Sequence, residues 1–265
     1  MKKVITLVIL LAMVSCKETV VTGFQDKPVI ESYLYADESP SVKVSKLIPF
    51  SSDFVFSDMD INKLDVSVTE TNTQKKYTLA NTGEGVYSNK SFVIKAGSTY
   101  QLTIPYNGLE VTATTVVPAK PMNVTISATT IAIPAMGEPG SGAIAEMPPP
   151  VEIDWSNDDQ SYYLVYVKNV ESVKVPINSK NPAGKDFFRN QPTTSDHAEL
   201  NARSFKFYGL HRIILYRIQP EYVLFFQETS NNSQSISEIK ANVENGMGIF
   251  TGINSVSTYL YVGTP

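Results

Sequence analysis

The feature that most constrains the fold is a repeated alternation of apolar and polar side chains in short segments of the chain. Residues 42–48, with the sequence VKVSKLI, alternate strictly, and residues 64–69, with the sequence LDVSVT, have the same period. A period of two places successive side chains on opposite faces of an extended strand, so that one face can enter a core. These segments lack the 3.6-residue period of an amphipathic helix. The alternation therefore predicts an all-β, mainly antiparallel protein.

The N-terminal part of the chain is predicted to form one β-sandwich domain over residues 26–119. Short expected strands separated by turns are typical of an immunoglobulin-like or transthyretin-like sandwich. Asn107 and Gly108 favour a tight hairpin, since both tolerate the positive φ of a type I′ turn. The expected strands are residues 28–35, 42–48, 64–69, 76–79, 97–104 and 109–116.

The rest of the chain, residues 120–265, is predicted to form a second β-rich, sandwich-like domain. Trp155 is placed to fill its core, a Pro/Gly-rich loop is expected over residues 134–150, and a long loop is expected over residues 176–201. Residues 221–227 fit either one short helix after Pro220 or a strand. The expected strands are residues 123–133, 151–155, 162–167, 205–208, 212–218 and 258–262.

The first residues of the chain predict a secretory leader and a lipid anchor. Two lysines precede an apolar run from Val4 to Val14, which is too short to cross a bilayer and suits a signal peptide over residues 1–15. The run ends at Ser15 and Cys16, which resemble the lipobox of bacterial lipoproteins. We therefore expect lipidation of Cys16, attachment to the membrane, and a tether over residues 16–25.

Composition excludes several classes of function. The chain has one Cys and two His, which argues against zinc fingers, iron–sulfur clusters and multi-histidine metal sites. Its formal net charge of −4 argues against non-specific nucleic-acid binding. We therefore expect no metal, no cofactor and no nucleic-acid partner.

Two adjacent phenylalanines are the predicted contacts for a ligand or a partner protein. Phe187 and Phe188 lie in a polar segment, where two neighbouring side chains cannot easily both enter a sandwich core. Tyr33, Tyr35 and Tyr208 could also offer aromatic platforms, but burial in the core is the simpler explanation for them.

Three patterns that resemble catalytic or ligand sites have simpler explanations. Asp154, Asp158 and Asp159 could supply oxygen ligands to Ca²⁺, but they lack the alternation and the bidentate Glu of a calcium loop. Residues 195–197, Ser-Asp-His, are adjacent, so their side chains diverge and cannot form a triad. Residues 246–252 lack the spacing of a dinucleotide loop and are expected to form a tight loop in which Phe250 closes the sandwich.

The remaining histidine has no expected catalytic role. His211 precedes the expected strand over residues 212–218, so a position in a turn or at a sheet edge is expected. We therefore predict no catalytic residue in this chain.

Several segments together resemble one family of bacterial lipoproteins. They are the lipobox, residues 27–34, residues 97–104, Trp155 with Tyr162 and Tyr163, and residues 242–252. This set resembles the Bacteroidota outer-membrane lipoproteins grouped as domain of unknown function 4249. Genes of that family often lie beside genes for TonB-dependent outer-membrane transporters, so the resemblance implies an accessory role in uptake at the cell surface.

We therefore expect a lipid-anchored, non-enzymatic outer-membrane protein that binds a ligand or a partner for a TonB-dependent transporter. Lys17 and Glu18, directly after the lipobox, resemble an export signal to the cell surface, although a linker facing the periplasm is the alternative. A structural or adhesive surface module is the second hypothesis. A surface hydrolase with paired carboxylates is the third.

Overall fold

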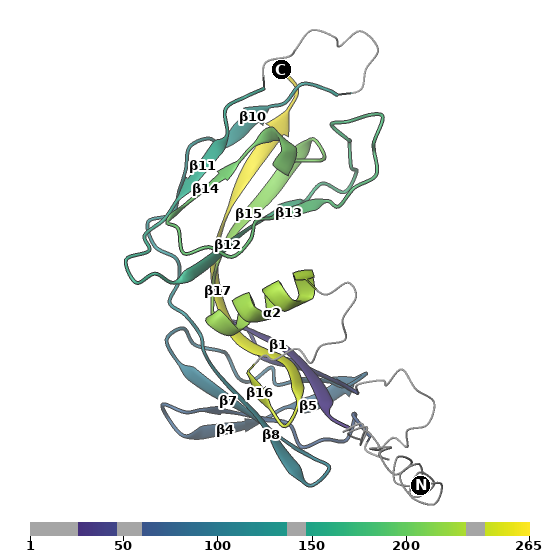
Figure 1. Cartoon of the computed structure of the whole chain (residues 1–265), viewed down its shortest axis with the longest axis vertical. Helices are drawn as coiled ribbons and strands as arrows, with labels where there is room; N and C mark the ends of the chain where they lie inside the picture. The colour runs from purple at the N-terminus through teal and green to yellow at the C-terminus, as the bar shows by residue number, and fades with distance from the viewer. Residues whose placement is uncertain (1–25, 47–59, 137–146, 232–241) are drawn as a thin grey trace, which may run out of the picture.

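The computed structural model describes residues 26–46, 60–136, 147–231 and 242–265. They form two β-sandwiches that lie end to end and share one long strand, β17 (Met247–Gly263) (Figure 1). The prediction of an all-β, mainly antiparallel fold with one short helix is confirmed for these residues. The predicted signal peptide, Cys16 and the tether lie outside them.

The N-terminal sandwich consists of two facing sheets. Its first sheet has, in spatial order, β5 (Ala80–Gly83), β6 (Val86–Ser88), β2 (Ser41–Lys46), β1 (Pro28–Tyr35) and the first part of β17. Its second sheet has, in order, β4 (Lys75–Thr78), β3 (Ser67–Glu70), β7 (Thr99–Tyr106), β8 (Leu109–Val116) and β16 (Val243–Glu244). The inward residues of both sheets, among them Ile30, Leu102 and Phe250, form one buried core.

The hairpin predicted at Asn107 and Gly108 is confirmed. It joins β7 to β8, and both turn residues have positive φ, 48° and 75°. The alternation of β7 is also as expected, since Tyr100, Leu102 and Ile104 are buried between half-buried neighbours. This agreement follows because turn chemistry and strand period are both local properties of the sequence.

The C-terminal sandwich has a larger and a smaller sheet. The larger one has, in order, β13 (Phe187–Arg189), β12 (Tyr162–Asn169), β15 (Gly209–Ile218), the last part of β17 and β10 (Thr130–Ala132). The smaller one has, in order, β14 (His197–Leu200), β11 (Val151–Asp154) and β9 (Thr125–Ile126), and a 3₁₀ turn, η1 (Ala202–Ser204), follows β14. Trp155 is buried in the core between them, as predicted.

β17 makes the two sandwiches one continuous structure. Its residues 247–253 pair in parallel with β1, and its residues 254–262 pair antiparallel with β15. The prediction of a tight loop over residues 246–252 is wrong from residue 247 on, because residues 247–252 belong to β17 and Phe250 is a central core residue with 0% exposure. The N-terminal sandwich, predicted as residues 26–119, thus also contains a segment from the end of the chain.

Two glycines allow β17 to run this close to its neighbours. Gly248 has φ 95°, and a Cβ there would lie 2.0 Å from the Ile30 carbonyl oxygen. A Cβ on Gly252 would lie 2.4 Å from the Val116 carbonyl oxygen. Both positions therefore exclude any larger residue, which is the reason for the glycines that the sequence analysis attributed to a loop.

The segment after Pro220 is a helix, α2 (Pro220–Asn231), rather than the alternative strand. It lies between the two sandwiches, in front of β17 (Figure 1). Val223 of α2 packs with Leu164, Ile218 and Ile253 in a third, small core. This third core joins the helix to strands of both sandwiches.

Two other segments differ from the sequence-based expectation. The expected long loop over residues 176–201 contains the short strands β13 and β14. The expected strand over residues 205–208 is reduced to a single bridge between Phe207 and Pro176, although both of its phenylalanines are buried. Residues 137–146 of the expected Pro/Gly-rich loop lie outside the described residues.

Candidate functional site

A cavity of about 400 Å³ is lined by residues of both sandwiches and of α2. Its apolar floor is formed by Leu164, Ile218 and Ile253, which also belong to the third core. The volume lies within the range of pockets that hold small organic molecules. We call this cavity the junction pocket.

Half-buried tyrosines form most of the wall of the junction pocket. Each occupies an outward position of its strand, such as Tyr166 between the core residues Val165 and Val167, or lies on the facing side of α2. They are Tyr33 and Tyr35 of β1, Tyr166 of β12, Tyr216 of β15 and Tyr222 of α2. The alternation that fills the sandwich cores thus also directs these rings into one space.

The rings of the wall contact one another across the junction. Tyr33 meets Tyr222 edge-on with 6.1 Å between ring centroids, and Tyr35 lies 6.4 Å from Tyr216. Such edge-on and tilted arrangements of aromatic rings are favourable beyond the burial of their surface. These contacts hold β1 of the first sandwich against α2 and β15.

Phe187 completes the wall on the side of the C-terminal sandwich. Its ring is stacked on Tyr166 with 5.4 Å between centroids and an interplanar angle of 23°. The ammonium group of Lys185 lies 5.4 Å from the centroid of the Phe187 ring, and the Arg189 guanidinium lies 4.4 Å from that of Phe226. Two exposed cations therefore stand at the mouth of an aromatic pocket.

Burial raises the pKa of the pocket tyrosines further above neutral pH. It raises the pKa of Tyr35 to about 12, with further contributions from Tyr216 and Tyr222. Burial also raises the pKa of Tyr33, Tyr166, Tyr216 and Tyr222 above the ordinary value. At neutral pH the hydroxyl groups are therefore neutral and can donate hydrogen bonds.

The helix that carries Tyr222 is fixed to the N-terminal sandwich by one carboxylate. Glu221 accepts hydrogen bonds from the hydroxyls of Thr115, at 2.5 Å, and Thr251, at 3.1 Å. The Thr115 hydroxyl in turn accepts the backbone N–H of Gly252 at 2.9 Å. These contacts set the position of α2 over the pocket.

The structure separates the two predicted contact residues. Phe187 faces the junction pocket, whereas Phe188, on the opposite face of β13, packs against the core of the C-terminal sandwich. Of the other aromatic residues considered, Tyr33 and Tyr35 line the pocket. Tyr208 instead packs against the C-terminal core and donates its hydroxyl to the Ile133 carbonyl at 3.0 Å.

Sequence reasoning missed the cations and most of the tyrosines of the pocket. Lys185 and Arg189 flank the predicted phenylalanine pair, two residues from Phe187 on either side. The signal present in the sequence was therefore an alternation of cations with an aromatic residue. Tyr166 and Tyr216 gave no signal of their own, because their meeting depends on the pairing of β12 with β15.

The aspartates considered as calcium ligands point to different partners. Asp154 binds the Nδ1 of His197 at 2.7 Å, and Asp159 pairs with Arg217. The hydrogen bond with the Ser161 side chain lowers the pKa of the Asp159 carboxyl, and the Arg217 charge and the backbone N–H of Ser161 lower it further. Within the described ranges, no group of three or more His, Cys, Asp or Glu side chains is placed to hold a metal ion.

The histidine of the Ser-Asp-His sequence has acidic neighbours rather than a nucleophile. The imidazole of His197 lies between Asp154 and Glu199, 3.7 Å from the latter. The Ser195 hydroxyl accepts the backbone N–H of His197 at 3.1 Å. The hydrogen bond with Asp154 raises the pKa of His197.

The expectation that His211 lies in a turn or at an edge is wrong. It is the third residue of β15 and has 3% exposure. Its Nδ1 lies 3.0 Å from the Gly209 carbonyl oxygen, and its Nε2 lies 3.3 Å from the amide nitrogen of Asn169. Burial lowers its pKa, so the ring is a neutral part of the C-terminal core.

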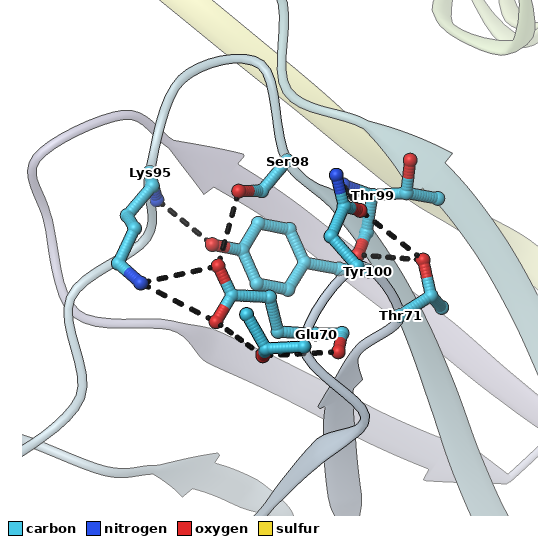
Figure 2. Close-up of polar contacts among 8 residues, drawn as sticks. Glu70, Thr71, Lys95, Ser98, Thr99 and Tyr100 are labelled. Atoms are coloured by element: carbon cyan, nitrogen blue, oxygen red, sulfur yellow. Dashed lines mark hydrogen bonds and ion pairs between the residues drawn. The ribbon is translucent and has the colours of Figure 1, made fainter.

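A buried carboxylate in the N-terminal sandwich is a densely bonded polar group away from the pocket. Figure 2 shows Lys95 and Ser98 directed at Glu70, which has 2% exposure. Lys95 binds its two oxygens at 3.2 and 3.3 Å, Ser98 donates at 3.1 Å, and Thr73 donates at 2.9 Å. Because its acceptors are used within the protein, we assign this cluster to the stability of the sandwich.

The described residues contain no helix that is both long enough and apolar enough to cross a membrane.

Comparison with known proteins identifies a family and gives structural likenesses, of which one is described below. The family described as Domain of unknown function (DUF4249) matches residues 17–259. No curated protein matches the chain. Among solved structures, the three N-terminal domains of the Highly Immunogenic Outer Capsid protein (Hoc) of bacteriophage RB49 share 9% identity with a TM-score of 0.23. That match covers 90% of this chain and 59% of the phage chain.

Proposed function

The chain belongs to the DUF4249 family, and on this premise we propose that it captures a small ligand at the outer membrane for a TonB-dependent transporter, without catalysis. In this proposal Cys16 carries the lipid anchor, and the two sandwiches face the cell exterior. The transporter is the partner that receives the ligand.

The observation that carries the proposal is the junction pocket. Its wall combines a large aromatic surface with a few polar groups at the mouth, which is the usual composition of a site for a small molecule. It also spans both sandwiches, since Tyr33 comes from the first and Phe187 from the second. A ligand there would contact both parts of the protein at once.

The test of the partner is copurification of the tagged full chain from detergent-solubilised membranes. We expect mass spectrometry to identify a TonB-dependent transporter in the purified material. The Cys16→Ala variant should lose its acyl chains and leave the membrane fraction, which provides the control for the anchor. Recovery of the lipoprotein without any transporter would contradict the proposed partnership. Retention of Cys16→Ala in the membrane would contradict the anchor.

The orientation of the protein is tested separately by protease treatment of intact cells. A surface-exposed protein should be degraded under these conditions, whereas a periplasmic control protein should survive. Protection of both proteins would place the chain on the periplasmic side.

A patch of exposed apolar residues favours the second candidate function, a structural or adhesive module. Leu210 and Tyr261 face each other across β15 and β17, and Tyr261 has 50% exposure. The nearby Val170, which donates its backbone N–H to the Leu210 carbonyl, is also exposed, as is Val173. Such a patch fits contact with another macromolecule. Deletion should then impair attachment and leave nutrient uptake unchanged, whereas ligand capture predicts the reverse.

A further inference from the structure

The cations at the mouth of the junction pocket lack acidic partners. Among the residues that the structure describes, Lys185 and Arg189 form no ion pair with a carboxylate. Asp186, between them in sequence, pairs instead with Lys174 at 3.7 Å. Lys185 contacts the Phe187 ring, and Arg189 contacts the Phe226 ring and the Tyr222 hydroxyl, so neither charge is neutralised by a carboxylate of the described residues.

The lining of the pocket has no negative charge to neutralise those cations. Its side chains are aromatic, aliphatic or cationic, and no carboxylate or amide is among the described residues that line it. Glu31 and Glu38 act on Tyr33 and Tyr35 from the side of the N-terminal sandwich. On the C-terminal sandwich, the Asp186 carboxylate and the Arg189 guanidinium both act on Tyr166, and of these two charged groups only Arg189 lines the pocket.

This composition distinguishes between classes of ligand. The hydroxyl groups of a neutral sugar call for several fixed donors and acceptors, and amide and carboxylate side chains provide both. The junction pocket offers ring faces, protonated tyrosine hydroxyls and two cations. Ring faces suit a flat ligand, and the two cations, which only donate, suit an anion, whereas the tyrosine hydroxyls can both donate and accept.

We propose that the junction pocket binds a planar aromatic carboxylate, with its ring among the tyrosines and Phe187 and its anionic group toward Lys185 and Arg189. This assignment rests on the proposed function as a ligand-capturing protein and gives the chemical class of the ligand. The ring of the ligand contacts both sandwiches. Its carboxylate contacts the C-terminal sandwich only.

Calorimetric titration of the full chain in detergent, with a detergent-only titration subtracted, tests this class. The probes are 2-naphthoate, which has ring and charge, 2-naphthamide, which has the ring alone, and cyclohexanecarboxylate, which has the charge alone. We expect naphthoate to bind at least tenfold more tightly than naphthamide, because hydrogen bonds to a charged group exceed about 1.4 kcal/mol. We expect it to bind at least tenfold more tightly than cyclohexanecarboxylate as well, because that probe lacks the aromatic ring. Equal binding of naphthamide and naphthoate, or no binding of naphthoate, would overturn the proposal.

Variants then locate the binding site. Lys185→Gln combined with Arg189→Gln should weaken naphthoate binding about tenfold and leave naphthamide binding unchanged. Phe187→Ala should weaken both aromatic probes. The matched control is Lys75→Gln, since the Lys75 ammonium lies 5.0 Å from the centroid of the Tyr77 ring, two residues away, in the N-terminal sandwich. If the control weakens naphthoate as much as the pocket variants do, the site is not the junction pocket.

The two proposals can fail independently. If naphthoate binds as expected but no transporter copurifies, the ligand class holds and the accessory role is wrong. If a transporter copurifies but naphthoate does not bind, the role holds and the ligand class is wrong.

Discussion

Two polar clusters of this protein each combine a lysine with aromatic rings, and they differ in what the lysine faces. In the N-terminal sandwich, Lys95 binds both oxygens of the buried Glu70 beside Tyr100 (Figure 2). At the junction pocket, Lys185 lies over Phe187 and has no carboxylate partner within the described part of the chain. The first cluster completes its hydrogen bonds internally and serves stability. The second has cations without carboxylate partners among the described residues, and it is the cluster at which we propose ligand binding.

The largest expected effect comes from comparing the same substitution in the two regions. Phe250→Ala removes a ring from the centre of the N-terminal core and should lower the free energy of unfolding by about 4 kcal/mol. Phe187→Ala removes a half-buried ring that is stacked on Tyr166 and should lower it by about 1 kcal/mol. Chemical denaturation of both variants measures this difference. Equal losses would show that Phe187 is a core residue and would remove the contrast.

The second effect concerns the carboxylate of the stability cluster. Glu70→Gln removes the charge that accepts hydrogen bonds from Thr73, Lys95 and Ser98, and should lower the free energy of unfolding by about 2 kcal/mol at pH 7. Lys185→Gln, at the pocket, should leave it nearly unchanged. Denaturation at pH 7 measures both values.

The same carboxylate predicts a dependence on acid. Burial alone would raise the pKa of Glu70, but its hydrogen bonds with Thr73, Lys95 and Ser98 lower it below the ordinary value. Its stabilising contribution is therefore present above the pKa of the unfolded chain and is lost as the pH falls through the folded pKa. The difference in the free energy of unfolding between the native protein and Glu70→Gln should disappear below about pH 4. A gap that stays constant down to pH 3 would contradict this assignment.

The sequence predicted the features that depend on local contacts and missed those that depend on contacts between distant segments. Local signals sufficed for the alternating strands, the hairpin at Asn107 and the core position of Trp155, since each depends on a few neighbouring residues. β17 was missed at its start because Gly246 and Gly248 suggest a turn; Gly246 does lie in a turn before the strand, whereas close approach to β1 requires Gly248. A local sequence pattern does not indicate which distant strand a segment will pair with.

The candidate site was predictable only in part for the same reason. Phe187 attracted attention because two phenylalanines follow each other in a polar segment. The pocket that surrounds it depends on Tyr33 and Tyr222 arriving from distant parts of the chain. Glu70 at the end of β3 looks like a solvent-exposed residue in the sequence, and only the fold brings Lys95 and Ser98 to it.

The third effect concerns the helix that covers the junction. Glu221→Ala removes the acceptor for Thr115 and Thr251 and a negative charge at the start of α2. We expect α2 to open more readily by about 1 kcal/mol, seen as roughly fivefold faster amide hydrogen exchange in the helix. Exchange in β7, within the N-terminal core, should not change. Faster exchange in both elements would mean that Glu221 supports the whole sandwich rather than the helix alone.

The smallest effect distinguishes the two histidines of the C-terminal sandwich by titration. The hydrogen bond with Asp154 raises the pKa of the exposed His197, whereas burial lowers that of His211, so their NMR midpoints should lie on opposite sides of 6.5. The contribution of His197 to stability is present below pH 6.5 and is lost as the pH rises through its folded pKa. That of His211 is present above pH 6.5 and is lost as the pH falls through its folded pKa. Asp154→Asn should return only the His197 midpoint toward 6.5, because Asp154 contacts His197 and not the buried His211 ring. A shift of both midpoints would show that the environments of the two histidines are coupled.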